Sequence, residues 1–458
     1  PDMFVDSITD STVKTHEIRI NAPINDNMSI TAGAFMSDLE LKEHNKFTYP
    51  GAVESDIGWG INYSLTDTSV YGYQALLDSA GNLKSKQYAA AGWHSGRGPY
   101  MPPVMFVNDI KRTDKQKGIF GELAIDLSNT VELTVGARWY DIEVDLEGAA
   151  NASFSTGFGG GDQQRFGTNL SAAFNEPGVV TGNPFIDSLD YPDKAESDGV
   201  IGKATLSWNK SDDVMYYVTW SEGFRPGLLN RPAGQSTPDG SYTVRPVTDS
   251  DEVTNYEFGW KTVLQDGRLR FNGSVFMVDV SGLQTTIFDP SIANLFFSDN
   301  AADADIRGLE GDFVYYPNID GLMISGAFSL LDTEIKKSLT TSDVVAGQDL
   351  AFAPGMQANL TSRYEWGMSS GNLGHIQGQL IASDKSFSDI IEPNKAQQDS
   401  YSYVNVRAGI SNDDWVAELY IDNITDERAE ISNNYVFDRQ RIAVIRPMTI
   451  GLRYKLNF

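Results

Sequence analysis

The sequence predicts an all-β protein, and more specifically a transmembrane antiparallel β-barrel. Three observations lead to this fold class. Apolar and polar residues alternate over stretches of about ten residues, as in a β-strand with one apolar and one polar face. Short polar turns alternate along the chain with long connections rich in Gly, Pro and Asp. No apolar run approaches the length of about 18 residues that indicates a spanning helix, whereas a spanning strand needs only about 9 to 11 residues.

The C-terminal stretch "MTIGLRYKLNF" shows the alternation clearly. One face would carry Met448, Ile450, Leu452, Tyr454, Leu456 and Phe458, and the other would carry Thr449, Gly451, Arg453, Lys455 and Asn457. The stretches "VELTVGARWY" at 131–140, "RLRFNGSVFM" at 268–277 and "MQANLTSRYEW" at 356–366 repeat the pattern. We expect each to cross a membrane, with its apolar face toward lipid and its polar face toward the lumen.

Counting such stretches predicts about fifteen strands. They are expected at 13–20, 28–41, 116–127, 130–147, 199–209, 213–224, 251–263, 268–280, 304–316, 320–332, 354–366, 372–384, 401–411, 413–422 and 447–458. The region 43–115 is ambiguous and leaves room for one further hairpin.

The connections between these strands sort by length. Short turns such as "QDGR" at 265–268 and "SNDD" at 411–414 are expected at one end of the strands. Long segments are expected at the other end, at 147–198, 225–250, 281–303 and 334–353. This layout is typical of an outer-membrane barrel, whereas a soluble β-sandwich has shorter strands and no such sorting.

Composition excludes several classes of protein. The formal net charge of -27 argues against a nucleic-acid partner, which would require a basic patch. The chain has no Cys and therefore neither a disulfide framework nor a thiolate metal site. The opening "PDMFVDSITD" has no basic segment followed by an apolar one, so no signal peptide is recognised. We therefore expect either that export is not required or that the native N-terminus lies upstream.

Catalytic patterns are lacking in the sequence. The four histidines, His16, His44, His94 and His375, are far apart and include no i, i+4 pair. The G-x-S-x-G match "GMSSG" at 367–371 falls in a predicted tight turn with no helix after it. The acidic runs "TDSDE" at 248–252 and "DNAADAD" at 299–305 lack the EF-hand spacing and are expected to be solvated loop faces. We predict no enzymatic activity, no cofactor and no metal site.

Two sets of residues are candidates for contacts in the lumen or at its mouth. The segment "GWHSGRGPYMPP" at 92–103 concentrates Trp93, His94, Arg97 and Tyr100, which suit an anionic or aromatic ligand at the outer mouth; plain loop packing is the alternative. The arginines expected on the inward face are predicted to pair with carboxylates of the wall or of a plug: Arg138, Arg270, Arg363, Arg407 and Arg453. Arg225 of "GFRPG" is interpreted as part of a structural strand end.

Several stretches resemble the β-barrel domain of TonB-dependent receptors. They include "GIFGELAIDLSNTVELTVGARWYDIEVDLEG" at 118–148, "SDDVMYYVTWSEGFRPGLLNRP" at 211–232, "VTNYEFGWKTVLQDGRLRFNGSVFMVDVSGLQ" at 253–284, "ADIRGLEGDFVYYP" at 304–317 and "AELYIDNITDERA" at 417–429. The resemblance covers about 16–458. It implies a barrel of 22 strands around an N-terminal plug. We accordingly expect residues 1–458 to be one truncated barrel domain, holding about 15–17 C-terminal strands and no plug.

The resemblance also implies a function. Such receptors lie in the outer membrane of Gram-negative bacteria, among lipid and lipopolysaccharide, and take up large scarce nutrients with energy from TonB, ExbB and ExbD. We expect a ferric siderophore first, with haem, cobalamin or an oligosaccharide as alternative ligands. A passive porin and a soluble all-β binding or enzymatic domain are the competing classes. By the same resemblance, Tyr454, Leu456 and Phe458 form the C-terminal signal that the barrel-assembly machinery reads.

Overall fold

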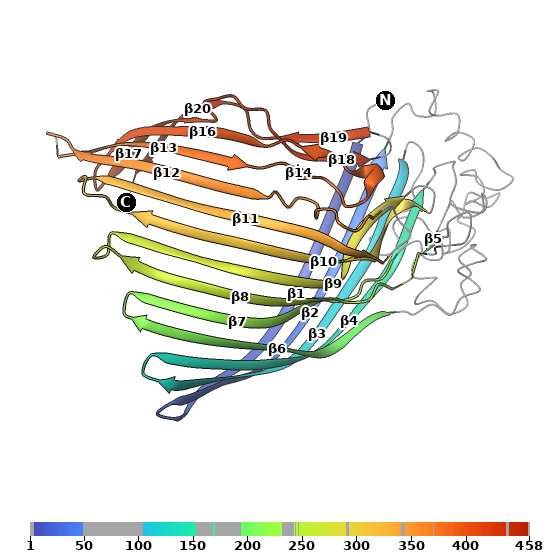
Figure 1. The fold of residues 1–458 in the computed structure, drawn as a ribbon. Coiled ribbons are helices and arrows are strands. Elements are labelled where there is room, and N and C mark those ends of the chain that lie inside the picture. Colours follow the sequence, from blue (N-terminus) through green and yellow to red (C-terminus); the bar gives the residue numbers. More distant parts are fainter. Residues whose placement is uncertain are drawn as a thin grey trace, which may run out of the picture.

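The computed structural model describes residues 4–48, 104–152, 168–169, 194–230, 242, 244–245, 247–289, 293–339, 344–369, 371–436 and 439–456. Fifteen strands form one antiparallel sheet in which each strand pairs with the next one along the chain (Figure 1). They are β1 (Phe4–Asn25), β2 (Met28–Thr48), β3 (Val104–Ser128), β4 (Val131–Ala152), β6 (Lys194–Ser211), β7 (Val214–Arg225), β8 (Asp251–Leu264), β9 (Leu269–Asp289), β10 (Ala293–Tyr315), β11 (Leu322–Ser338), β12 (Met356–Gly367), β13 (Leu373–Ser383), β16 (Tyr401–Ser411), β17 (Trp415–Asp422) and β20 (Thr449–Leu456). The short β5 (Thr168–Asn169) pairs with β4 beside this path.

All fifteen predicted strands are therefore confirmed, and several are longer than predicted. The expected long loop at 281–303 is wrong, because β9 continues to Asp289 and β10 begins at Ala293. The possible further hairpin within 43–115 falls mostly on residues outside those described. β2 pairs directly with β3, so the sheet has no additional strand between these two.

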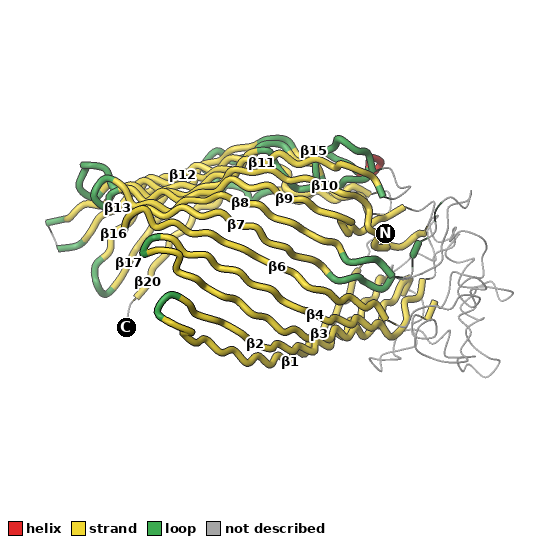
Figure 2. The backbone as a smooth tube through the Cα atoms, turned by 60° about the horizontal axis from the view of Figure 1, so that its bottom comes forward, coloured by secondary structure: helices red, strands yellow, loops and turns green. Residues whose placement is uncertain are grey.

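The sheet is curved, and its two ends differ. Figures 1 and 2 show short turns at one end, here called the turn end, and long connections at the opposite loop end. At the turn end, Asp26 and Asn27 alone separate β1 from β2. The turn between β8 and β9 places Gln265, Asp266 and Gly267 at positive φ, a conformation that costs little only for Gly. The predicted sorting of connections by length is confirmed except between β9 and β10, which only residues 290–292 separate at the loop end.

The two faces of the sheet change polarity along β4. In the half nearer the turn end, the outward side chains are apolar, and Val135 and Trp139 are 37% and 40% exposed. Beyond Tyr140 the pattern reverses. The inward Ile142 and Val144 are then only 5% and 2% exposed, and the outward positions are Asp141, Glu143 and Asp145. The side chains of β4 alternate without a break through this point. The reversal therefore reflects a change in what contacts each face of the sheet, and not a shift in strand register.

Neighbouring strands reverse at nearly the same level. The outward residue changes from apolar to charged between Met36 and Asp38 in β2, Ile119 and Lys117 in β3, Val200 and Asp198 in β6, Met277 and Asp279 in β9, Leu309 and Arg307 in β10, and Leu330 and Asp332 in β11. Cross-strand register places these changes within one or two residues of each other. We call the apolar part on the turn-end side of this level the outward band. No helix among the described residues is long and apolar enough to cross a membrane.

A hydrophobic core lies at the loop end. Its buried members come from β9, β10, β11 and three connections, and are Val244, Ile287, Phe297, Ala301, Ala302, Ile335, Val344, Ile390 and Ile391. Beside it lie two small hairpins, β14–β15 (Ser386–Phe387 and Gln397–Gln398) and β18–β19 (Glu430–Val436 and Arg439–Val444), and the 3-10 turn η4 (Glu392–Asn394). This core explains the incorrect loop at 281–303: inward Ile287, Phe297 and Ala302 are buried against the connections, and the strands continue into them.

The ends of the sheet do not pair with each other in the described ranges. β1 is bonded to β2 only, and β20 to β17 only. Side chains of β1 are almost all exposed. The described strands thus form a curved wall. Two expectations stay predictions: that the complete barrel is closed by 22 strands, and that residues 1–458 are one truncated domain.

Candidate ligand passage on the inward face

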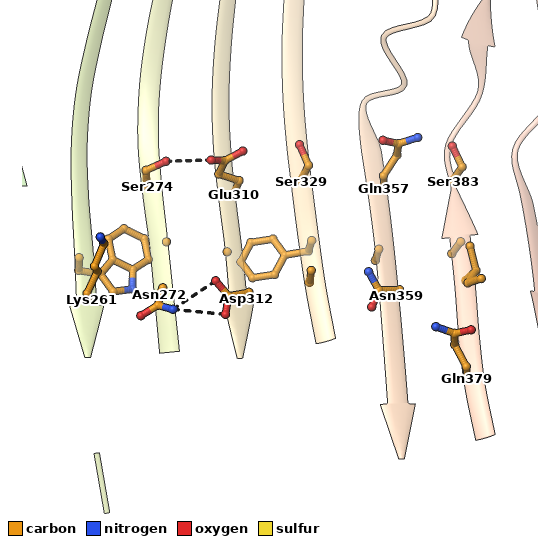
Figure 3. Close-up of a pocket in the computed structure, with 18 of the residues that line it drawn as sticks. Lys261, Asn272, Ser274, Glu310, Asp312, Ser329, Gln357, Asn359, Gln379 and Ser383 are labelled. Carbon is orange, nitrogen blue, oxygen red and sulfur yellow. Dashed lines mark hydrogen bonds between the residues drawn. The ribbon is translucent and has the colours of Figure 1, made fainter. Parts of the chain in front are cut away.

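A pocket of about 720 Å³ lies against the inward face of β7 to β13 and β16. Figure 3 shows its polar lining, which is mostly amide, hydroxyl and carboxylate groups. The labelled residues are Lys261, Asn272, Ser274, Glu310, Asp312, Ser329, Gln357, Asn359, Gln379 and Ser383.

Strand register brings these side chains to one face. Glu310 is opposite Ser274 on β9 and Ser329 on β11, and Asp312 is opposite Asn272. Residues two apart on a strand point to the same side, so β9 adds Asn272 and Ser274 and β12 adds Gln357 and Asn359 to the same face. Leu309, between these positions, lines a separate groove on the outward face. Leu309 and Glu310, which are adjacent on β10, thus point to opposite faces of the sheet.

The carboxylates of the pocket are only loosely held by the wall. Asn272 Nδ2 lies 3.3 Å from both Asp312 oxygens, and Ser274 Oγ lies 3.4 Å from Glu310 Oε1. Both distances are at the long end for hydrogen bonds, so these oxygens can accept donors from a bound molecule. Lys261 has no hydrogen-bond or ion-pair partner in the described part of the chain, and is the cation of this pocket that remains available. The arrangement can bind polar groups by hydrogen bonding, but it contains no nucleophile activated by a base.

Other inward residues are already paired across strands. Tyr217 donates its hydroxyl hydrogen to Glu257 on β8, and Asn405 donates to Gln379 over 3.0 Å. Lys203 pairs with Glu122 on β3. The first two contacts join neighbouring strands, and the third reaches across β4. Mid-wall amides such as those of Gln357 and Asn359 have no such partner among the described residues.

Four of the five predicted inward arginines pair with wall carboxylates. The pairs are Arg270 with Asp312 at 3.7 Å, Arg363 with Glu365 at 2.7 Å, Arg407 with Asp422 at 3.6 Å and Arg453 with Glu418 at 3.5 Å. Arg138 has no carboxylate contact among the described residues of the wall, and its pairing with a plug stays a prediction. Its guanidinium lies 5.6 Å from the centre of the Phe35 ring, an aromatic partner that alternation alone does not reveal.

Glu418 is the centre of a buried charged cluster near the turn end. Its carboxylate lies 3.2 Å from His375 Nε2, 3.5 Å from Arg453 Nη1 and 3.8 Å from Arg407 Nη1. These groups come from four consecutive strands of the sheet, β13, β16, β17 and β20. Sequence reasoning missed this cluster because His375 and Glu418 are 43 residues apart. The only available signal was that both fall on the polar face of their strands.

At the loop end, the connection from β7 to β8 is attached by polar contacts. Arg225 Nε donates to Asp251 Oδ2 over 2.7 Å, and Gln284 Nε2 donates to the carbonyls of Pro226 and Asp249, each over 2.9 Å. Asp251 is 1% exposed, so its charge requires the guanidinium. These contacts agree with the structural role predicted for Arg225. Nearby, burial raises the pKa of the Asp389 carboxyl, against the opposing effect of the backbone N–H of Ile391.

The predicted ligand contacts Trp93, His94, Arg97 and Tyr100 lie outside the described residues, so they stay predictions. Of the predicted assembly signal, Tyr454 and Leu456 lie on the outward side of β20 and are 61% and 48% exposed. Phe458 also lies outside the described residues, and the assembly signal stays a prediction. The described ranges contain no group of three or more potential metal-ligating side chains.

Comparisons with solved structures identify the same wall in known receptors. The ferric yersiniabactin uptake receptor FyuA from Yersinia pestis matches with a TM-score of 0.66 at 12% identity, covering 100% of this chain and 56% of FyuA. The siderophore receptor PiuA from Acinetobacter baumannii matches with a TM-score of 0.62 at 16% identity, covering 97% and 56% of the two chains. The pyoverdine receptor FpvA from Pseudomonas aeruginosa matches with a TM-score of 0.59 at 14% identity, covering 100% and 54%. At such identities the likeness establishes the fold.

The chain thus spans just over half the length of these receptors, at 54–56%. Its sequence also matches a family described as TonB dependent receptor-like, beta-barrel, over residues 6–424. That match includes fourteen of the fifteen strands, β1 to β17, and all of the pocket shown in Figure 3. The chain therefore belongs to the TonB-dependent receptor family, as part of its β-barrel domain.

Proposed function

We propose that this chain forms part of the barrel wall of a transporter in the outer membrane of a Gram-negative bacterium. We propose further that the transporter takes up a ferric siderophore. The observation that carries the proposal is the polarity of the two faces. Outward side chains of the band are apolar and exposed, as lipid contact requires, while the inward face is polar and borders a pocket of about 720 Å³. A soluble β-sandwich would instead bury its apolar face under a second sheet.

The choice of a siderophore is supported by the receptors that share this fold. FyuA is described as a ferric yersiniabactin receptor and PiuA as a siderophore receptor. The inward wall is compatible with this ligand class, because its hydroxyl, amide and ammonium groups can bind the oxygen-rich periphery of a chelate. Haem, cobalamin and oligosaccharides are the alternative ligands.

Energy would come from TonB, ExbB and ExbD, acting on a plug inside the barrel. Paired charges on the wall, such as Arg363 with Glu365, then form the surface against which a plug rests. Ligand contacts at the outer mouth are proposed for Trp93, His94, Arg97 and Tyr100. The residues Tyr454, Leu456 and Phe458 are proposed as the signal for the barrel-assembly machinery.

Uptake by a deletion strain tests the proposal. Cells lacking the gene are grown on a panel of ferric siderophores, haem and cobalamin, with and without TonB, and radiolabelled ligand uptake is measured. Loss of uptake of one ferric siderophore, restored by the gene only when TonB is present, is the expected result. Unchanged uptake of every iron source would contradict the siderophore assignment.

A passive porin makes a different prediction for the same strains. It would give TonB-independent uptake and steady ion conductance when the purified protein is inserted into planar bilayers. TonB-dependent uptake together with a closed pore in bilayers separates the transporter from the porin.

A further inference from the structure

The inward face of the wall is not uniformly charged. In the middle of the wall, β3, β4, β6, β8 and β10 each present charged side chains to the lumen, such as Glu122, Lys261 and Glu310. The strands β11 and β12 do not. Their inward side chains at this level are all uncharged, and we call them the neutral track: Ser325, Ala327, Ser329, Gln357, Asn359 and Thr361.

Cross-strand register makes the neutral track continuous. Ser329 is opposite Gln357, and Ser325 is opposite Thr361 at the end of the track nearer the turn end. Four residues at about 3.4 Å each give the track a length of roughly 14 Å along the strands. Figure 3 shows Ser329, Gln357 and Asn359 on these two strands, among the side chains that line the pocket. On β13 the same rows continue with uncharged side chains.

The hydrogen-bonding groups of the neutral track are available to a ligand. Gln357 and Asn359 are exposed, and neither they nor Ser329 has a side-chain hydrogen-bond partner in the described part of the chain. On β3 and β6 the opposite holds, because Lys203 pairs with Glu122 within the wall. The track therefore offers its polar groups to the lumen, whereas these charged side chains already engage each other.

Uncharged partners suit a ligand that must move. A site on a transport path has to bind strongly enough to be entered and weakly enough to be left, and several equivalent sites in line satisfy both conditions. Hydrogen bonds between neutral groups are roughly half as strong as those that involve a charge. A ligand can therefore exchange one amide or hydroxyl group of the neutral track for the next without being trapped.

The amide side chains also indicate what kind of ligand surface fits the track. Each amide of Gln357 and Asn359 can donate and accept, and the Ser329 hydroxyl can do both as well. The complementary ligand surface carries N–H, O–H and C=O groups, as in a peptide hydroxamate. An aryl shell would instead need aromatic or cationic partners, and the neutral track has neither.

We propose that the neutral track is the path along which the ligand moves through the barrel, and that the ligand is a ferric siderophore of the peptide hydroxamate class. Ser329, Gln357 and Asn359 contact its amide and hydroxyl groups in passage, while the charged parts of the wall hold a plug. The inference rests on the proposed uptake function. It adds the class of siderophore, and it assigns these side chains to the rate of passage rather than to binding at the outer mouth.

Uptake by cells that carry the full receptor tests the proposal. Radiolabelled iron is supplied as two panels, ferric peptide hydroxamates and ferric aryl catecholates, and we expect TonB-dependent uptake of a peptide hydroxamate. Gln357→Met and Asn359→Leu nearly keep the side-chain size and remove the hydrogen bonds. Each should lower the maximal uptake rate about fivefold, the effect of losing one neutral hydrogen bond. Ser329→Trp narrows the pocket and should lower the rate at least as much.

Two controls separate passage from binding and folding. Binding of the same chelate to cells without TonB reports the outer mouth, and it should stay within about twofold in every variant. Gln116→Met is the matched control, because Gln116 is an inward amide on β3, opposite Ile142 of β4 and outside the neutral track. Its uptake rate should also stay within about twofold. Mobility on unheated gels confirms that each variant is folded.

Several results would overturn the neutral track while TonB-dependent uptake still stands. They are normal rates in all three track variants, a matching loss of binding in cells without TonB, an equal loss of rate in Gln116→Met, and uptake of catecholates only. A rise in resting ion conductance of Ser329→Trp in planar bilayers would also overturn it, because the pocket would then seat a plug. Uptake that depends on neither the gene nor TonB for any iron source contradicts the proposed function instead, so the two failures give different results.

Discussion

His375 Nε2 and Glu418 Oε2 lie 3.2 Å apart, on two strands that are separated in the sheet by β16. The His375 side chain is 3% exposed and that of Glu418 is 9% exposed. The contact crosses Gly409 of β16, where a Cβ would lie 2.6 Å from the imidazole Cε1. Glycine at this position therefore lets the two side chains meet over the intervening strand. With Arg407 and Arg453, the pair connects the last four strands at the turn end.

Glu418→Ala is expected to destabilise the folded wall by about 2–3 kcal/mol, because it leaves the Arg407 and Arg453 guanidinium groups and the buried His375 imidazole without their shared carboxylate. Thermal unfolding of the full receptor in detergent, followed by gel mobility, measures the loss. The matched control is Glu365→Ala, which removes one carboxylate that is 47% exposed and pairs with Arg363. It should cost less than about 1 kcal/mol. Equal losses in the two variants would show that burial of the cluster contributes nothing.

The sequence predicted the fifteen strands because the period of two is a local signal, and each polar face could be assigned from it. The sequence wrongly predicted a loop at 281–303. In this part of the sheet the outward side chains are charged, and apolar side chains such as Ile287 point inward and are buried. The contact of Arg138 with the Phe35 ring was not predicted, because it depends on the register of β2 with β3 and β4. The Glu418 cluster and the outward groove were missed for the same reason. Each combines residues from three or more strands, and the sequence pattern of one strand does not show which residues of other strands lie beside it.

Leu452→Lys tests the lipid contact of the outward band. Leu452 lies on the outward side of β20 and is 75% exposed. A lysine near the middle of a membrane strand costs about 2–4 kcal/mol, so we expect that loss and a lower yield of folded protein in the membrane. Asp38→Lys lies outside the band and should change stability by less than about 0.5 kcal/mol. Folded yield and unfolding in lipid vesicles give the measurement. A tolerated lysine at both positions would contradict a lipid-facing β20.

Lys261→Gln tests the sign of the ligand's charge. Lys261 is exposed in the inward pocket and is unpaired among the described residues, so an anionic chelate passing the wall can bind it. Loss of one charge-assisted hydrogen bond of about 1.5 kcal/mol corresponds to roughly tenfold weaker binding. Uptake measured against ligand concentration should therefore show a higher KM for an anionic ligand. Lys203→Gln is the control, because Glu122 already engages that ammonium group. A neutral ligand would be taken up equally well by Lys261→Gln and the native receptor.

Gly321→Ala is expected to distort the turn between β10 and β11, in which Gly321 directly precedes β11. Gly321 has φ +82°, and a Cβ there would lie 1.9 Å from the carbonyl oxygen of Glu365. Because that oxygen belongs to the backbone, it cannot move aside as a side chain would. We expect a loss of about 1–3 kcal/mol in unfolding measurements. Gly223→Ala on β7, where no atom lies within 4 Å of the added Cβ, should cost less than about 0.5 kcal/mol. A neutral Gly321→Ala would contradict the strained backbone at this turn.

Asp389 and Asp426 should give opposite pH responses at the loop end. Burial raises the pKa of Asp389 above its usual value of 3.8, so the folded state binds a proton more tightly than the unfolded state. Its contribution to stability is favourable at low pH and is lost as pH rises through the folded pKa. Asp389→Asn keeps an oxygen for the backbone N–H of Ile391, which Asp389 Oδ1 accepts over 3.0 Å. This variant should stabilise the loop end at neutral pH, and the gain should shrink on acidification.

The carboxyl of Asp426 is shifted the other way. The backbone N–H of Met448 and the Arg428 guanidinium donate to it over 2.9 and 3.1 Å and lower its pKa. Its contribution is therefore present above pH 3.8, the ordinary value, and is lost as pH falls through the folded pKa. Asp426→Asn should destabilise the protein at neutral pH, with the difference from the native protein vanishing in acid. Unfolding of both variants between pH 3 and pH 8, roughly the range that spans carboxyl titration, measures the two slopes. Slopes of the same sign would show that the burial of Asp389 is not what sets its charge.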